Sequence, residues 1–258
     1  PNINAEETGI TTIADFRRRD IAAGGQGAPL VPAFHKAIFS QIFDLAKKNI
    51  SIVNIGGIAN ITYLSKDKTI GFDTGPGNTL MDYWIQKNLN IAYDKDGAWA
   101  KTGKANPRLL KALTQDPYFN LDLPKSTGKE YFSTSWLNEK IQLSQACNAN
   151  DIQASLCYLT AETITAAIKK HAPLTDQTLI CGGGMHNSYL IELIRKNLNH
   201  PISSTAEFGI NPDHVEAMAF AWLARQTMSN LSGNLTEVTG AKQAVILGGV
   251  YPGLNGLN

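Results

Sequence analysis

The sequence lacks several features that would place it in a simple class. No apolar run approaches the roughly 20 residues of a membrane-spanning helix, so we expect no association with a membrane. The formal net charge is only +1, which predicts no overall attraction to nucleic acid. The chain opens with Pro1-Asn2-Ile3 and shows no basic segment followed by an apolar run. A signal peptide is therefore not predicted, and a cytoplasmic protein is expected.

Cysteine is also scarce. The three cysteines, Cys147, Cys157 and Cys181, are odd in number, and no two of them have C-x-x-C spacing. A disulfide framework or a structural zinc site is therefore not expected. We predict reduced and partly buried thiols instead.

What the chain does contain is a regular alternation of strand and helix patterns. Apolar, β-branched runs predict a meander of three strands over residues 50–55, 58–64 and 69–72. Residues 1–30 are interpreted as strand and loop, and further strands are predicted at 178–181 and 244–250. Helices are predicted over 32–48, after Asn78, and over 107–113, 151–170 (with Asp151 as its N-cap), 188–198 and 213–228. This order indicates an α/β fold with a mixed sheet.

One candidate catalytic motif is Gly-Phe-Asp-Thr-Gly-Pro-Gly-Asn at residues 71–78. Asp73 ends a predicted strand, and Gly75 and Gly77 allow a ligand to approach the backbone closely. The helix expected after Asn78 would offer free N–H groups to an anion. This arrangement suits a general base beside a phosphate, although Asp73 could equally serve only as a cap or a turn residue.

Two further glycine motifs follow predicted strands. Asn54-Ile55-Gly56-Gly57-Ile58-Ala59-Asn60 indicates a hairpin whose tip could bind phosphate oxygens, or a plain hairpin. Cys181-Gly182-Gly183-Gly184-Met185-His186 indicates a strand that leads into bare backbone, where a nucleotide could lie. We expect no catalytic role for His186.

Two charged segments stay ambiguous on their residues alone. Residues 16–29 combine arginines, a carboxylate and a Gly/Gln loop, which suits an anionic, hydroxyl-rich ligand but also a solvated basic turn. Glu216 lies near the start of the predicted helix 213–228, where a carboxylate is favourable with the helix dipole.

The order of these motifs is more specific than any one of them. Nearly the whole chain resembles the anhydro-N-acetylmuramic acid kinase family, which belongs to the actin, hexokinase and heat-shock ATPase superfamily. The resemblance lies in the segments 15–22, 24–32, 54–60, 71–78, 96–100, 116–119, 124–130, 181–184, 216–222 and 238–241.

The resemblance implies an α/β, actin-like (ribonuclease H-like) ATPase fold of two lobes, with ATP and Mg²⁺ as cofactors. It implies that Asp73 is the catalytic base and that Glu216 helps to hold the attacking water. The residues implied near ATP are Asn54, Gly56, Gly57, Asn60, Gly75, Gly77, Asn78, Gly182, Gly183 and Gly184. Those implied near the sugar are Arg18, Arg19, Asp20 and Gln26.

The chain departs from the family pattern in one respect. The family begins with a glycine-rich phosphate hairpin of the type Gly-x-Met-Ser-Gly-Thr-Ser-x-Asp-Gly, and nothing in this sequence matches it. We therefore expect an incomplete N-terminal lobe at 1–75 and a C-terminal lobe at 76–258.

The expected reaction opens 1,6-anhydro-N-acetylmuramic acid with water and phosphorylates O6 during peptidoglycan recycling. Another sugar kinase of the superfamily, a catalytically incomplete fragment that only binds, and a pure glycosidase are the alternatives. The expected partners are ATP and the sugar, and self-association into a homodimer stays open.

Overall fold

The computed structural model describes residues 1–144 and 148–254, and the chain forms two compact units. Unit 1 comprises Pro1–Phe43 and Glu216–Asn258, and unit 2 comprises Asp44–Val215. This division differs from the expected one at 75/76. The physical reason is that the three strands up to residue 76 belong to one sheet with a strand near residue 180, which pairs directly with residues 50–54, so a boundary cannot pass between them.

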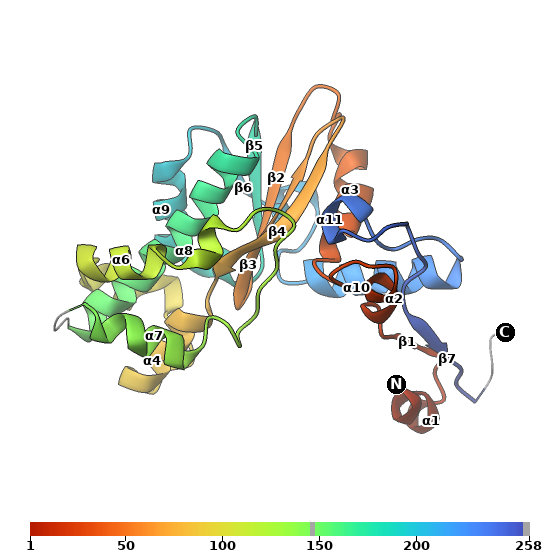
Figure 1. Cartoon of the computed structure of the whole chain (residues 1–258), viewed down its shortest axis with the longest axis horizontal. Helices are drawn as coiled ribbons and strands as arrows, with labels where there is room; N and C mark the ends of the chain where they lie inside the picture. Colours follow the sequence, from red (N-terminus) through yellow and green to blue (C-terminus); the bar gives the residue numbers. More distant parts are fainter. Residues whose placement is uncertain (145–147, 255–258) are drawn as a thin grey trace. The chain divides into compact units, whose positions relative to one another are not determined.

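The centre of unit 2 is a five-stranded mixed sheet in the order β4–β3–β2–β5–β6 (Figure 1). The strands are β2 (Ile50–Ile55), β3 (Ile58–Leu64), β4 (Thr69–Pro76), β5 (Gln177–Cys181) and β6 (Ile202–Ser204). β3 runs antiparallel to β2 and β4, whereas β5 runs parallel to β2 and β6. This sheet of parallel and antiparallel strands confirms the predicted α/β fold with a mixed sheet.

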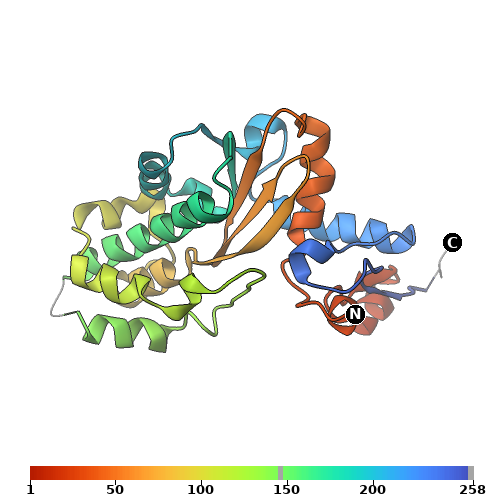
Figure 2. The same cartoon turned by 45° about the horizontal axis from the view of Figure 1, so that its top comes forward.

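The long helix α8 (Ala149–His171) contacts β3 and β4. Figures 1 and 2 show it beside the sheet, with other helices of unit 2 beyond it. Those helices are α4 (Thr79–Leu89), α5 (Ala98–Thr102), α6 (Pro107–Thr114), α7 (Thr134–Gln142) and α9 (Ser188–Asn197). Helix α8 begins after Asn148 rather than at Asp151. The Asp151 carboxylate instead accepts a hydrogen bond from the Lys104 amide at 2.7 Å.

The core of unit 2 explains why the apolar patterns predicted these elements well. Leu80, Met81, Trp84 and Ile85 of α4 are all buried, as their helical spacing predicts. The cysteines that the structure describes, Cys157 and Cys181, are fully buried thiols, while Cys147 lies outside the described residues.

Unit 1 contains a two-stranded antiparallel sheet of β1 (Thr12–Ala14) and β7 (Gly249–Tyr251). Its helices are α1 (Asn2–Thr8), α2 (Arg18–Ala22), α3 (Val31–Ile42), α10 (Val215–Met228) and α11 (Thr236–Thr239). The interpretation of 1–30 as strand and loop was therefore wrong for α1 and α2. The last strand, Gly249–Tyr251, is also shorter than the predicted 244–250.

Helix α3 ends six residues before the predicted position. The cause is Asp44, whose carboxylate accepts a hydrogen bond from the Ala46 amide at 3.1 Å. Its backbone carbonyl also accepts bonds from the amides of Lys47 and Lys48. Such local bonds compete with the helix and favour a turn.

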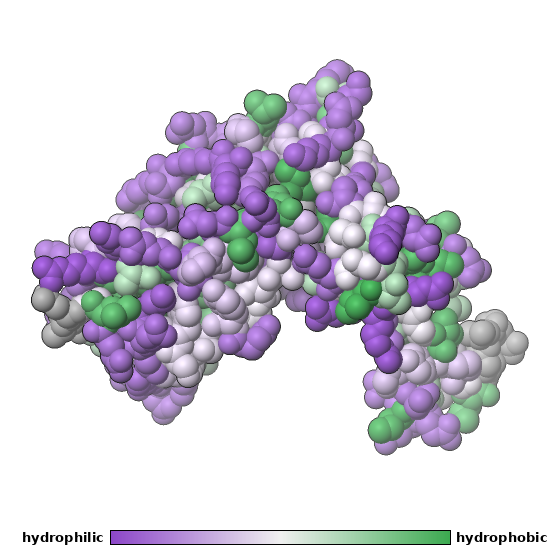
Figure 3. Space-filling model, viewed as in Figure 1, coloured by the Kyte–Doolittle hydropathy of each residue, from purple (hydrophilic) through white to green (hydrophobic). Residues whose placement is uncertain are grey.

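Within the described part of the chain, no helix combines the length and apolar character needed to cross a bilayer. Figure 3 shows a face on which hydrophilic side chains predominate and hydrophobic ones are scattered. Scattered apolar side chains are usual on a protein surface.

Candidate functional site

Asp73 lies inside β4 rather than at its end, because this strand continues to Pro76. Its side chain is only 9% exposed. The Oδ2 atom of Asp73 accepts a hydrogen bond from the Thr127 amide at 2.9 Å. The backbone carbonyl oxygen of Asp73 accepts another from the Tyr118 hydroxyl at 2.6 Å. With its carboxylate and its backbone both hydrogen-bonded, Asp73 keeps one orientation, which suits a general base.

The segment that holds Asp73 is itself anchored. Lys125 is buried, and its ammonium group donates to the carbonyl oxygens of Tyr118 at 3.1 Å and Phe119 at 3.4 Å. Burial lowers the pKa of Lys125. The Asp116 carboxylate accepts bonds from the Tyr131 hydroxyl and the Trp136 indole, each at 2.8 Å. None of these residues was predicted as part of the site. Asp116, Tyr118, Phe119 and Lys125 lie in segments that carried the family resemblance, whereas Tyr131 and Trp136 lie outside those segments.

The hairpin between β2 and β3 joins the turn that follows β4. The amides of Gly77 and Thr79 donate to the Gly57 carbonyl at 2.9 and 3.2 Å, and the Asn78 amide donates to the Gly56 carbonyl at 2.8 Å. The expectation of free N–H groups here is therefore wrong for these three residues. Their amides instead fix the hairpin tip against the start of α4.

The third glycine motif meets the same edge of the sheet. Asn54 pairs in register with Cys181, the last residue of β5. Gly182 has φ +79°, and a Cβ at this position would lie 2.4 Å from Asn54 Oδ1. Glycine is therefore required where the chain leaves β5. The Asn78 side chain donates to the Ile55 carbonyl at 3.3 Å, so Asn54, Asn78 and Gly182 lie close together.

The remaining predicted residues of unit 2 lie along these same elements. Asn60 of β3 stands opposite Asp73 of β4, next to an irregularity in the pairing at Ala59. Gly75 also belongs to β4, and a Cβ on it would contact the Phe119 ring. Gly184 packs against Ile55. The structure thus brings together in unit 2 the three motifs that the sequence separates.

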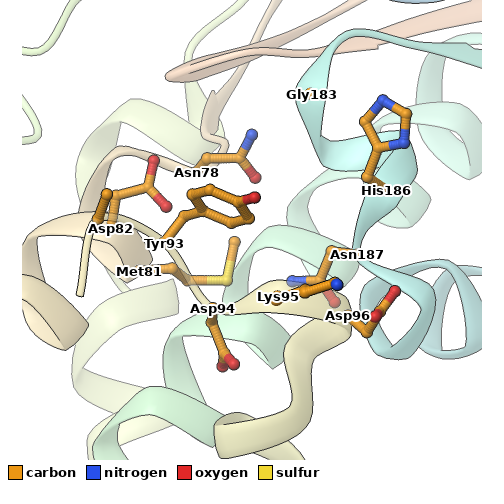
Figure 4. A pocket seen from close by; sticks show the side chains of 11 residues that line it. Asn78, Met81, Asp82, Tyr93, Asp94, Lys95, Asp96, Gly183, His186 and Asn187 are labelled. Carbon is orange, nitrogen blue, oxygen red and sulfur yellow. The ribbon is translucent and has the colours of Figure 1, made fainter. Parts of the chain in front are cut away.

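A cavity of about 550 Å³ opens beside this group of residues (Figure 4). Of the residues implied near ATP, Asn78 and Gly183 line it, but most of its walls come from residues for which the sequence predicted no site role. These other lining residues are Met81, Asp82, Ala92, Tyr93, Asp94, Lys95, Asp96, His186 and Asn187. A volume of this size is in the range of small-molecule sites.

Two carboxylates of this cavity, Asp82 of α4 and Asp94, have different surroundings. The pKa of Asp82 is raised to about 6, mainly because burial disfavours its charged form; the charge of Lys129 opposes this rise and the charge of Asp94 adds to it. The Asp94 carboxylate accepts bonds from the amides of Trp99 and Ala100, both at 2.9 Å. Asp94 therefore binds two backbone amides of α5, whereas the Asp82 carboxylate changes charge near pH 6.

The exposed His186 ring is hydrogen-bonded through Nε2 to the Asp213 carboxylate at 2.8 Å. Among the residues that the structure describes, no group of three or more His, Cys, Asp or Glu side chains could hold a metal ion. The expected Mg²⁺ would accordingly take most of its ligands from nucleotide phosphates and water, which is its usual mode of binding.

The predicted sugar-side residues lie in unit 1 and play unequal parts. Asp20 is fully buried, and its carboxylate accepts bonds from the Gly27 amide at 2.8 Å and from Asn234 and Thr239 at 2.7 Å each. Asp20 thus shapes the Gly/Gln loop from inside the unit. Arg18 is exposed and paired with Asp15 at 2.6 Å.

The other predicted residues of unit 1 are exposed. Arg19 and Gln26 both present their side chains to solvent, and the Gln26 amide donates to the Thr239 carbonyl at 2.9 Å. Glu216 is also exposed, in the first turn of α10. These three side chains are therefore accessible to a ligand.

Comparison with known proteins gives one consistent family. A family model described as "Anhydro-N-acetylmuramic acid kinase" matches residues 1–253. A protein of that name from Pseudomonas syringae pv. syringae is 48% identical over 254 residues, which cover 98% of this chain and 69% of the relative. One from Legionella pneumophila is 50% identical over 247 residues, which cover 95% of this chain and 66% of the relative. The chain thus spans about two thirds of the length of these relatives.

Solved structures resemble the chain more distantly. An activator of 2-hydroxyisocaproyl-CoA dehydratase from Clostridium difficile, with bound ADPNP, gives a TM-score of 0.43 at 14% identity and covers 65% of this chain and 56% of its own. The ethanolamine utilization protein EutJ from Carboxydothermus hydrogenoformans gives a TM-score of 0.36 at 15% identity and covers 72% of this chain and 50% of its own. These values carry no argument about function. The sequence match over residues 1–253 shows that the chain belongs to the anhydro-N-acetylmuramic acid kinase family.

Proposed function

We propose that this chain supplies the catalytic base and the nucleotide-binding elements of an ATP-dependent kinase that opens 1,6-anhydro-N-acetylmuramic acid and phosphorylates its O6. The observation that carries the proposal is the fixed carboxylate of Asp73, next to a glycine hairpin in a chain of this family. We also propose that the reaction belongs to cytoplasmic recycling of peptidoglycan sugars.

The proposed chemistry joins two steps. Asp73 takes a proton from a water molecule, whose oxygen bonds to the anomeric carbon as the bond from that carbon to O6 breaks. A base on the face opposite the leaving oxygen is also what inverting glycosidases use. The released O6 then bonds to the γ-phosphorus of ATP, and ADP leaves. Asp73 afterwards gives its proton to solvent.

Several residues have supporting roles in this proposal. The Thr127 amide and the Tyr118 hydroxyl hold Asp73 in place, and Glu216 orients the water. Asn54 to Asn60, together with Gly75, Gly77 and Asn78, lie at the phosphates, and Gly182 to Gly184 lie at the adenosine. Arg18, Arg19 and Gln26 contact the sugar, while Asp20 supports their loop. Mg²⁺, bound with ATP, would neutralise phosphate charge.

The test is to incubate the protein with the anhydro-sugar, ATP and Mg²⁺ and to follow ADP release and product mass. The proposal expects a product that has gained both water and a phosphoryl group. Plain N-acetylmuramic acid is the comparison substrate, because an ordinary sugar kinase would add only a phosphoryl group to it. ADP release without added water in the product would disprove the hydrolytic step.

Replacing Asp73 by Asn should lower turnover by about 10²–10⁴-fold, which is the usual contribution of a general base. The melting temperature should stay close to that of the original protein. Asp67→Asn is the matched control, since Asp67 is exposed in the turn between β3 and β4. Turnover of Asp73→Asn within a few-fold of the original would show that Asp73 is not the base.

A further inference from the structure

The hairpin tip between β2 and β3 has a cationic neighbour that no motif predicted. An ideal Cβ on Gly57 would lie 2.6 Å from Cε and 3.2 Å from Nζ of Lys129. It would also lie 3.0 Å from the Thr79 hydroxyl, in the first turn of α4. The Lys129 side chain therefore lies across the face of Gly57, in the space that any other residue at position 57 would fill.

The ammonium group of Lys129 is available for a ligand. Among the residues that the structure describes, no carboxylate lies within ion-pair distance of Lys129, and its side chain is exposed. The charge of Lys129 lowers the pKa of Asp82, and no ion pair between the two side chains is present in the described part of the chain. The other lysine of this segment, Lys125, is buried and already donates to two carbonyl oxygens.

The need for such a cation follows from the backbone around it. The amides of Gly77, Asn78 and Thr79 are already donated to the hairpin carbonyls, so they are not available for an anion at this turn. The hairpin carbonyls of Gly56 and Gly57 also bring partial negative charge to the same place. A phosphate group here therefore needs positive charge from a side chain, and Lys129 is the one that lies across the tip.

We propose that the Lys129 ammonium group binds a phosphate oxygen of the nucleotide at the hairpin tip, and that Gly57 is required to let it lie there. The inference rests on the proposed function, because it assumes that the phosphates of ATP reach this hairpin. A single charged contact of this kind is typically worth about a tenfold change in affinity or more. Because the group is exposed, its contribution should weaken as ionic strength rises.

The experiment measures the affinity of the purified chain for ATP, ADP and adenosine by calorimetry at low and at moderate salt. Lys129→Met should lower the affinity for ATP and ADP about tenfold and leave the affinity for adenosine within twofold of the original. Lys129→Arg keeps a cation and should stay within about threefold of the original for all three ligands. Lys66→Met is the matched control, since it removes an exposed charge from the turn at the opposite end of β3.

Gly57→Ala provides a second, independent test. The added methyl group should displace the Lys129 side chain and lower the affinity for ATP about as much as Lys129→Met does. The affinity of the double variant for ATP should be no lower than that of either single variant, because both changes remove the same contact. Additive losses would show that Gly57 and Lys129 act separately and would overturn the inference.

The outcomes separate the two proposals. If the original chain prefers ATP to adenosine and Lys129→Met keeps that preference, the inference is wrong and the proposed function stands. Equal weakening of ATP and adenosine in Lys129→Met would indicate a general structural effect and would also overturn it. If the original chain shows no preference for ATP over adenosine, the nucleotide-binding role proposed for the hairpin fails, and the inference fails with it.

Discussion

At the scale of single residues, Asp73 shows how much depends on neighbours that are distant in sequence. Its carboxylate is held by the amide of Thr127, and its carbonyl by the hydroxyl of Tyr118. These contacts come from a loop about 50 residues further along the chain, so no local motif could have predicted them. The sequence predicted the residue but not the groups that orient it.

Asp82 gives a prediction that depends on pH. Its pKa in the folded protein is about 6, above the ordinary value of 3.8, because burial disfavours the charged form. The stability that it contributes is therefore fully present below about pH 4 and is lost as pH rises through about 6. Relative to Asp82→Asn, the free energy of unfolding of the original protein should fall by about 1 kcal/mol between pH 4 and 7, after allowance for solvent screening.

Urea unfolding of both proteins at pH 4, 5, 6 and 7 measures this difference. Asp67→Asn serves as the exposed control and should follow the original protein at every pH. A difference between the original and Asp82→Asn that stays constant with pH would contradict the raised pKa.

At the scale of elements, helix α3 carries a buried histidine. His35 is fully buried, with the Phe39 ring at 5.8 Å, and burial lowers its pKa to about 3. The ring is therefore neutral in the folded protein, while the unfolded chain takes up a proton below pH 6.5. The stability from this group is fully present above pH 6.5 and is lost as pH falls towards 3, at about 1.4 kcal/mol per pH unit.

The prediction for α3 can be checked in two ways. The His35 ring carbons should show no titration by NMR between pH 8 and 5, because burial lowers the pKa of this ring to about 3. His35→Gln should also unfold with a shallower dependence on acid than His214→Gln. A midpoint for His35 near 6.5 in the folded protein would contradict its burial.

At this same scale, the sequence predicted two strands closely and the ends of other elements less well. The strands at 50–55 and 58–64 agree with the structure, because β-branched runs with a Gly-Gly break leave few alternatives. Helix α3 was predicted too long, because the Asp44 turn that ends it depends on one side-chain hydrogen bond. Strand β4 was predicted too short, because its glycines and proline resemble a loop until the pairing with β3 is known.

At the scale of the whole molecule, unit 1 is held together by residues from both ends of the chain. Asp20 from the first part accepts hydrogen bonds from Asn234 and Thr239 of the last part. The change Asp20→Asn replaces one carboxylate oxygen by an NH₂ group, which cannot accept hydrogen bonds from the groups that donate to Asp20. We expect a loss of about 2–3 kcal/mol in the stability of unit 1, the usual cost of unpaired buried groups.

Amide hydrogen exchange measures where this loss falls. Faster exchange in Asp20→Asn should be confined to residues 1–43 and 216–258, and unit 2 should keep its protection. Asp15→Asn is the matched control, since Asp15 forms only a surface ion pair with Arg18 and should change stability by less than about 1 kcal/mol. Equal loss of protection in both units would contradict their division.

The sequence by itself determined the α/β class, the order of the glycine motifs and the family, because strand and helix periodicities and a long series of short motifs are local properties of the chain. Only the tertiary structure decided that 1–43 joins 216–258, that Asp20 is internal and that Lys129 lies on Gly57. The physical reason is that these contacts join residues from about 70 to more than 200 positions apart. Their partners become neighbours only when the sheet and the helices have packed.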